Sequence, residues 1–298
     1  MTDGRAVVVI GDLILDMISR FDGPVALGTD TFTPVYARPG GSGANAAAWL
    51  AHLGLDTHLV ARAGDDVFGR YLADELQKDG VTPHVAYDTE LETGKVFVLV
   101  DGVGERTMIT HRGASDNLNP NDLSKELFQN RNHLHLSGYT FSGGTRRASA
   151  HRALNLARDT TMTVSVDPSS VPLLGDIGPE NFLQWTAGAD LIFPNHEEGA
   201  LLTATDDPED IADALLNHYP AIVLKLGAGG ALFADIDGTR IRLPAARTKA
   251  VDTTGAGDAL CAGFLAAWLR DATPAEALKS GLVTAARVVG QIGGRPES

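Results

Sequence analysis

From about residue 131 onward, short apolar runs alternate with longer segments that have the composition of helices. The expected strands cover residues 133–136, 163–166, 191–193 and 221–225, and the expected helices cover residues 145–158, 197–203, 256–270 and 274–289. This alternation predicts a mostly parallel central sheet, covered by helices on both faces and connected by right-handed crossovers. The apolar run Ala6–Ile10, ended by Gly11, predicts a further strand buried on both faces. The predicted fold class is therefore α/β.

Two other segments break this alternation. Residues 20–39 contain three prolines among β-forming side chains, and residues 95–101 and 107–112 have the pattern of a hairpin. We expect these segments to form a small β-sheet lid over the edge of the main sheet. The lid would comprise residues 13–40 and 93–112, and the large α/β domain would comprise residues 1–12, 41–92 and 113–298.

Composition and charge exclude several classes of protein. The chain has 298 residues, of which 44% are hydrophobic, and a formal net charge of −14. The acidic balance argues against nucleic acid or an anionic membrane as the main partner, and an anionic substrate would need local cations or backbone dipoles. The single cysteine, Cys261, excludes an intrachain disulfide and a thiolate metal cluster. The apolar run Ala6–Ile10 is too short for the hydrophobic region of a signal peptide or for a membrane span, so we expect a cytoplasmic protein.

A glycine-containing loop at residues 251–258 leads into the expected helix 256–270. Gly255 and Gly257 lack a Cβ and let a ligand approach the backbone. The amide groups of a first helical turn have no partner within the helix, and together with the helix dipole they form a site for an anion such as phosphate. Asp258 lies at the edge of this anion site, where its carboxylate could accept the proton of an attacking hydroxyl group. The alternative is that Asp258 only favours the helix N-terminus and the glycines only form a turn.

A second glycine-rich loop, at residues 39–43, precedes an alanine-rich helix that is expected to stop at Gly54. Asn45, in the first turn, can donate and accept hydrogen bonds, which suits a polyol. Residues 41–46 also fit the dinucleotide-binding pattern G-x-G-x-x-A. That fingerprint should follow the first strand directly, whereas here it comes about 30 residues after Ile10, so we do not favour a dehydrogenase.

Polar residues follow several expected strands, where open α/β sheets bind their ligands. Asp12 and Asp16 follow the first strand, and we favour a functional role for Asp16 more than for Asp12. Asn195 and Glu198 follow the strand 191–193, and a carboxylate with an amide suits Mg²⁺ or its bound water. The alternative for Glu198 is a charge that stabilises the N-terminus of its helix.

A third glycine loop follows the strand 221–225. Lys225 and the open backbone from Gly227 to Gly230 are suited to contact nucleotide phosphates. The P-loop pattern G-x-x-x-x-G-K-[ST] does not occur in the sequence, so this would not be a Walker-type kinase.

Two further pairs of side chains share strand faces. Arg106 and Arg112 would lie on one face of the lid hairpin, where they could contact an anionic group of a substrate, although solvated edge charges are the simpler interpretation. His133 and His135 share a strand face, but because no third ligand is suggested, we favour packing or hydrogen bonding over a metal site.

These motifs together resemble the ribokinase-like (PfkB-type) carbohydrate kinases over essentially the whole chain. The resemblance is carried by Gly40-Gly41-Ser42-Gly43-Ala44-Asn45 and by Asp252-Thr253-Thr254-Gly255-Ala256-Gly257-Asp258. Asn195-x-x-Glu198 and the Gly227 loop fall between them in the order of the family. The resemblance implies a large α/β domain with a small β lid, and ATP-dependent phosphorylation of a hydroxyl of a sugar or nucleoside.

The resemblance also implies site roles. Asp258 matches the catalytic base, and the anion hole matches Gly255, Ala256 and Gly257. The segment that organises Mg²⁺ and phosphates matches Asn195 and Glu198, and the nucleotide loop matches Lys225, Gly227 and Gly230. The polyol-binding positions match Asp16, Gly41 and Asn45.

Several points stay open within the resemblance. Some members bind K⁺ beside the anion hole, which here would involve Asp252, Thr254 and the loop 293–297. Ribokinases usually carry a lysine where this chain has Ser42, so the substrate is undecided between a neutral sugar, an acidic sugar of the 2-keto-3-deoxygluconate type, a sugar phosphate and a nucleoside. A regulatory sugar-binding protein is the non-enzyme alternative, and the lid could pair with a second copy to form a homodimer.

Overall fold

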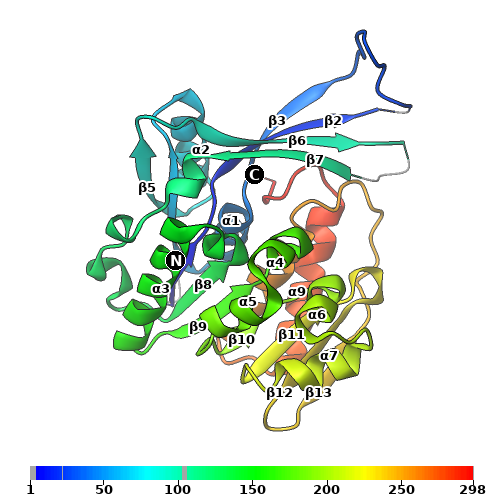
Figure 1. The fold of residues 1–298 in the computed structure, drawn as a ribbon. Coiled ribbons are helices and arrows are strands. Elements are labelled where there is room, and N and C mark those ends of the chain that lie inside the picture. Colours follow the sequence, from blue (N-terminus) through cyan, green and yellow to red (C-terminus); the bar gives the residue numbers. More distant parts are fainter. Residues whose placement is uncertain (1–4, 22, 103–105, 298) are drawn as a thin grey trace.

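The computed structural model describes residues 5–21, 23–102 and 106–297. A large sheet with helices on both faces forms one part of the molecule, and a smaller sheet projects from it (Figure 1). This arrangement confirms the predicted α/β class.

The large sheet has nine strands in the order β13-β12-β11-β10-β9-β8-β1-β4-β5. From β11 to β5 neighbouring strands run parallel, and β12 is antiparallel to both of its neighbours. The bounds are β1 Ala6–Ile10, β4 Asp56–Gly64, β5 Thr82–Asp88, β8 His133–Ser137, β9 Thr163–Asp167, β10 Leu191–Ile192, β11 Ala221–Lys225, β12 Ala231–Asp235 and β13 Arg240–Leu243. All five residues of β1 are buried, as its unbroken apolar sequence predicts.

The helices form a layer on each face of this sheet. One hydrophobic core contains side chains of α1 Ser42–His52, α2 Val67–Lys78, α8 Ala256–Trp268 and α9 Pro274–Val289. The core of the other face contains side chains of α3 Gly144–Asp159, α4 Val171–Ile177, α5 Pro179–Trp185, α6 His196–Thr203 and α7 Pro208–Leu215. Short 3-10 turns lie at η1 Ala114–Asn117, η2 Pro120–Asp122, η3 Lys125–Phe128, η4 Gly138–Phe141 and η5 Gly227–Gly229.

Two glycines let α1 meet the end of β1 at backbone distance. A Cβ added to Gly43 would lie 2.6 Å from the Cα of Gly11, so a side chain at either position would force the helix away from the strand. The N-terminus of α1 is therefore held directly over the end of the central strand.

The small sheet has four strands in the order β3-β2-β6-β7, with bounds β2 Ile14–Arg20, β3 Val35–Gly40, β6 Thr93–Val100 and β7 Arg106–Gly113. The β2–β6 pair is parallel and the other two pairs are antiparallel. The strands come from the two segments that the sequence predicts for the lid. The sheet extends over the C-terminal loop in Figure 1. The division into two domains at the predicted bounds stays a prediction.

Among the helices of the described residues, none combines the length and apolar character that crossing a membrane requires.

Candidate active site

The candidate residues gather at one edge of the large sheet, under the lid. Most follow the carboxyl ends of the parallel strands β1, β10 and β11 or lie at the N-termini of α1 and α8, whereas Asp16, Arg106 and Arg112 lie on the lid strands β2 and β7. In open α/β sheets this edge is where ligands bind.

Asp258 lies in the first turn of α8, and both of its carboxylate oxygens accept hydrogen bonds. Its Oδ1 accepts a hydrogen bond from the Ser42 hydroxyl at 2.8 Å, and its Oδ2 accepts one from the Asn45 side-chain amide at 3.0 Å. Burial, and then the negative charge of Asp167, raise the pKa of Asp258 to about 7. A fixed carboxylate that titrates near neutral pH has the properties of a general base.

The backbone at residues 255–258 forms a turn with free amides, the candidate anion-binding turn. Gly255 is the N-cap of α8 and has φ 74°, in the left-handed region that glycine tolerates. Within the described residues, the amide groups of Gly257 and Asp258 have no hydrogen-bond acceptor. Free amides at a helix N-terminus attract an anion, because the helix dipole adds to their own partial charges.

The predicted polyol residues lie beside Asp258. Asp16 is buried on β2, and burial, followed by the charge of Asp12, raises its pKa to about 7. The Asn45 Oδ1 is buried without a hydrogen-bond partner among the described residues. A Cβ added to Gly41 would lie 2.4 Å from the backbone oxygen of Asp12, so this turn also packs tightly against the end of β1. Buried carboxylates and an orphaned amide oxygen are acceptors that sugar hydroxyl groups would satisfy.

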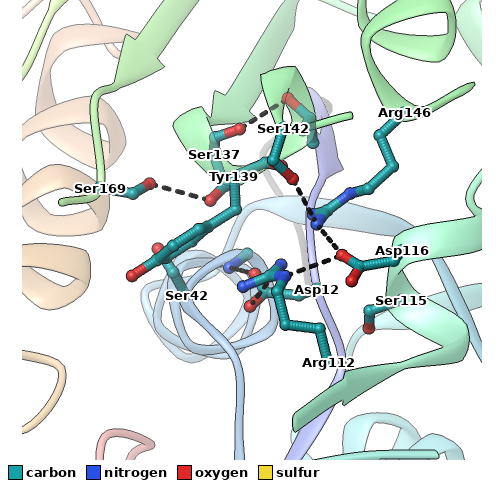
Figure 2. A network of polar contacts seen from close by, with 12 residues as sticks. Asp12, Ser42, Arg112, Ser115, Asp116, Ser137, Tyr139, Ser142, Arg146 and Ser169 are labelled. Atoms are coloured by element: carbon teal, nitrogen blue, oxygen red, sulfur yellow. Dashed lines mark hydrogen bonds and ion pairs between the residues drawn. The ribbon is translucent and has the colours of Figure 1, made fainter. Parts of the chain in front are cut away.

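Arg112 reaches into this region from the lid strand β7, as Figure 2 shows. Its Nε donates to Asp116 Oδ1 at 3.0 Å, and its Nη2 lies 3.6 Å from Asp12 Oδ2. The guanidinium lies over the Tyr139 ring, 4.4 Å from the centroid. Nη2 is buried and makes no hydrogen bond to the described residues. The sequence interpretation of Arg112 as a solvated edge charge is therefore wrong, since only 17% of its side chain is exposed.

Arg146 on α3 contacts the same Asp116 carboxylate as Arg112. Its Nη1 donates to Asp116 at 2.9 Å and to Ser142 at 3.0 Å (Figure 2). Burial, with the nearby charge of Arg112, lowers the pKa of Arg146 to about 10, so the guanidinium stays charged at neutral pH.

Arg106, at the start of β7, contacts a different part of the site. Its Nη1 donates to Thr254 Oγ1 at 3.0 Å, in the loop just before the anion-binding turn. Asp252 accepts hydrogen bonds from the Thr254 amide at 2.9 Å, the Thr254 hydroxyl at 2.7 Å and the Gly293 amide at 3.0 Å. The lid, the C-terminal loop and the anion-binding turn are thus joined through Asp252 and Thr254.

Asn195 and Glu198 cap the N-terminus of α6. The Asn195 Oδ1 accepts from the Glu198 amide and the Glu198 Oε2 accepts from the Asn195 amide, both at 2.8 Å. Glu198 therefore stabilises the N-terminus of its own helix, which is the alternative role that the sequence left open. Burial, only partly offset by Lys225, raises the pKa of Glu198 to about 7. Its Oε1 takes part in no described hydrogen bond and is an oxygen of the type that Mg²⁺ prefers. Within the described ranges, no group of three or more His, Cys, Asp or Glu side chains forms a ready metal site.

The two histidines of β8 form hydrogen bonds, as the sequence predicts. The Ser165 hydroxyl lies 2.7 Å from His133 Nε2 and 2.8 Å from His135 Nδ1. Burial lowers the pKa to about 3 for His133 and about 4 for His135, so both are neutral.

Sequence reasoning missed other residues of the site. Asp167 ends β9 and accepts a hydrogen bond from Lys225, while Tyr139 and Arg146 surround Arg112. Ser42, noted only as a departure from ribokinases, holds Asp258. Asp167 could have been found, because it follows an expected strand just as Asn195 does. Tyr139 and Arg146 give no comparable signal.

A half-buried carboxylate at a helix N-terminus, free amides beside it and acceptors for hydroxyl groups are the features expected of a phosphotransferase of the α/β class with a lid. The family model described as pfkB family carbohydrate kinase matches residues 5–298. An ATP-dependent ribose-1-phosphate kinase of Halopiger xanaduensis is 31% identical over 86% of this chain and 82% of its own length. A fructokinase of Klebsiella pneumoniae is 31% identical over 87% of this chain and 82% of its own length.

Solved structures agree. The fructokinase of Vibrio cholerae O395, determined with fructose, ADP and calcium bound, superposes with a TM-score of 0.85 and 26% identity. The match covers 98% of this chain and 95% of that one. The chain therefore belongs to the pfkB family of carbohydrate kinases, and it is a phosphotransferase that transfers a phosphoryl group from ATP to a sugar hydroxyl.

Proposed function

We propose that this sugar kinase uses Asp258 as its base and Gly255, Ala256 and Gly257 as its anion hole. The hydroxyl oxygen of the sugar attacks the γ-phosphorus of ATP, and its proton passes to the Asp258 carboxylate. As the new O–P bond forms, the bond to the bridging oxygen breaks and ADP leaves with the electron pair. The amides of the hole stabilise the charge on the transferring group. The observation that carries this proposal is the Asp258 carboxylate, fixed by Ser42 and Asn45 beside free helix amides.

The remaining roles follow from the same geometry. Asp16, Gly41 and Asn45 would bind the sugar hydroxyls, since they supply buried acceptors and close access to the backbone. The nucleotide would lie along the loop after β11, which includes Gly227 and Gly230. The family relation implies Mg²⁺, and a solved relative contains ATP with Mg²⁺. The free Glu198 oxygen, with Asn195 beside it, would hold a water of that ion, which would neutralise phosphate charge when bound.

The test is release of ADP with ATP and Mg²⁺ across a panel of neutral sugars, sugar acids, sugar phosphates and nucleosides. We expect one class to turn over well above the rest. Each assay is run with K⁺ and with tetramethylammonium at equal ionic strength. We further propose that a monovalent cation binds beside Asp252 and Thr254, so that K⁺ gives the higher rate. No turnover of any class together with a failure to bind ATP would favour a sugar-binding regulator.

We predict that kcat/KM rises with pH through about 7. A base with a raised pKa of about 7 is active only when deprotonated, so activity is lost as pH falls below that value. Asp16 and Glu198 also have pKa values of about 7, so the observed midpoint reports all three carboxylates. A rate that does not change between about pH 5.5 and 8.5 would contradict this.

Arg112 favours one second candidate, a sugar that carries a carboxylate or phosphate group. A buried guanidinium nitrogen without a hydrogen bond, backed by Arg146, is suited to receive such an anion. We predict that Arg112→Met lowers kcat/KM about 100-fold for an anionic sugar and only a few-fold for a neutral one, because it removes a charge-assisted hydrogen bond. Arg106→Met, which removes a lid contact to Thr254, is the matched control. Equal losses on both classes of sugar would mean that Arg112 only braces Asp12 and Asp116.

We also propose a homodimer through the lid. Phe97 and Ile109 face each other on neighbouring strands and are 47% and 60% exposed, an apolar surface that a second lid would cover. Sedimentation equilibrium would show a single monomeric species if this is wrong.

A further inference from the structure

Lys225 lies away from the place that the sequence suggests for it. Its ammonium donates a 2.7 Å hydrogen bond to Asp167 Oδ2, across the end of the two-residue strand β10. A Cβ built on Gly257 would lie 3.3 Å from the Lys225 Nζ, whereas a Cβ built on Gly227 would have no atom within 4 Å. The ammonium is therefore next to the first turn of α8 and is not folded onto the glycine loop that follows β11.

Lys225 is a fixed cation in an acidic surrounding. Burial, the largest single effect, would lower its pKa, but the acidic neighbours, led by Asp167 and including Glu198, together outweigh burial, so the pKa is raised and the ammonium stays charged. Glu198 and Asp258 also act on it electrostatically. The Cys261 thiol donates to the same Asp167 oxygen at 3.1 Å. Asp167 thus fixes the lysine, while the net charge around it stays negative.

The ammonium has unused hydrogen-bonding capacity. A lysine carries three N–H donors, and the described residues accept from only one of them. The amides of Gly257 and Asp258, beside it, also have no acceptor among the described residues. Donors of two kinds thus converge at one partly buried turn, an arrangement suited to an anionic ligand.

We propose that Lys225 is a catalytic residue whose ammonium donates to a non-bridging oxygen of the phosphoryl group in transit. It acts together with the amides at Gly255–Gly257, and Asp167 is its positioning residue. This inference rests on the proposed function, and it replaces the nucleotide-loop role that the sequence suggests. Lys225 keeps its proton throughout, because the hydroxyl proton passes to Asp258.

The first test compares Lys225→Met with the double variant Asp167→Asn/Lys225→Met. The single variant leaves the buried Asp167 carboxylate without its cation and is expected to melt at a lower temperature. The double variant removes both charges and is expected to recover stability. We expect kcat to fall about 100- to 1,000-fold in both variants, as when a donor to a developing oxyanion is removed, and KM for ATP to change less than about threefold. Recovery of kcat in the double variant would show that the lysine only neutralises Asp167. A large rise in KM for ATP at unchanged kcat would show that Lys225 binds the nucleotide and does not stabilise the phosphoryl group in transit.

The second test does not depend on turnover. Mg²⁺–ADP with fluoroaluminate imitates the phosphoryl group in transit, so wild type should bind ADP at least about tenfold more tightly when fluoroaluminate is present. The double variant should lose this enhancement and keep its affinity for Mg²⁺–ADP alone. An equal enhancement in both proteins, or none in wild type, would overturn the proposal. If wild type phosphorylates no compound of the panel, the proposed function fails, yet this comparison still reports on Lys225.

Discussion

Asp258→Asn is expected to lower kcat by about two to four orders of magnitude, because the asparagine amide cannot accept the hydroxyl proton. The substitution is nearly isosteric, and the Asn45 and Ser42 side chains stay in place to contact it. The measurement is ADP release at saturating sugar and ATP. Because only the base is lost, KM for ATP should change little. Turnover near that of wild type would remove Asp258 from the role of base.

The same variant should be no less stable than wild type at pH 8. The raised pKa of Asp258, about 7, means that the folded protein favours the protonated carboxyl. Its contribution to stability is therefore lost as pH rises from the unfolded value of about 3.8 through 7, the reverse of the usual salt-bridged carboxylate. Asparagine has no such pH-dependent penalty. A melting temperature at pH 8 clearly below that of wild type would show that the ionised carboxylate supports the fold.

The fold was predictable where a single segment carries its own signal. The unbroken apolar run Ala6–Ile10 matches β1 residue for residue, and the glycine loop before Ala256 marks the start of α8 correctly. Such elements depend on local pattern and capping, which are readable along the chain. The short strand β10 was predicted one residue too long, because a strand end is set by its neighbours in the sheet.

The site was predictable as a set of strand ends and glycine turns, but its contacts were not. Asp258 meets Ser42 and Asn45 across more than 200 residues of sequence, and no periodicity encodes that pairing. Arg112 illustrates the limit. The alternation of residues along the lid strand predicts which face of the strand carries Arg112, but it does not predict whether that face is buried or exposed to solvent. Lys225 shows the same limit, since its position at a strand end was correct and the direction of its side chain was not deducible.

Gly255→Ala is expected to lower kcat about 100- to 1,000-fold through displacement of the anion hole. An added Cβ would lie 2.5 Å from the Cα of Gly294 and 2.9 Å from its carbonyl oxygen. Because these are backbone atoms, the turn before α8 must move. The left-handed φ of 74° adds about 1–2 kcal/mol of strain for alanine. Urea denaturation and ADP release measure the two effects separately.

Gly143→Ala is the matched control for that variant, because Gly143 is also a helix N-cap with positive φ, at 67°, but its added Cβ would meet no atom within 4 Å. Its ψ of 167° places it in a region nearly restricted to glycine, so alanine there costs about 1–3 kcal/mol, at least as much strain as at Gly255. We therefore expect comparable losses of stability from the two substitutions and a loss of kcat from Gly255→Ala alone. If both variants lose kcat in proportion to their stability, backbone strain and not the geometry of the hole limits the reaction. If Gly255→Ala keeps full turnover, the phosphoryl group does not pass along the first turn of α8, because a turn that has moved to make room for the methyl group cannot present its amides at the same point.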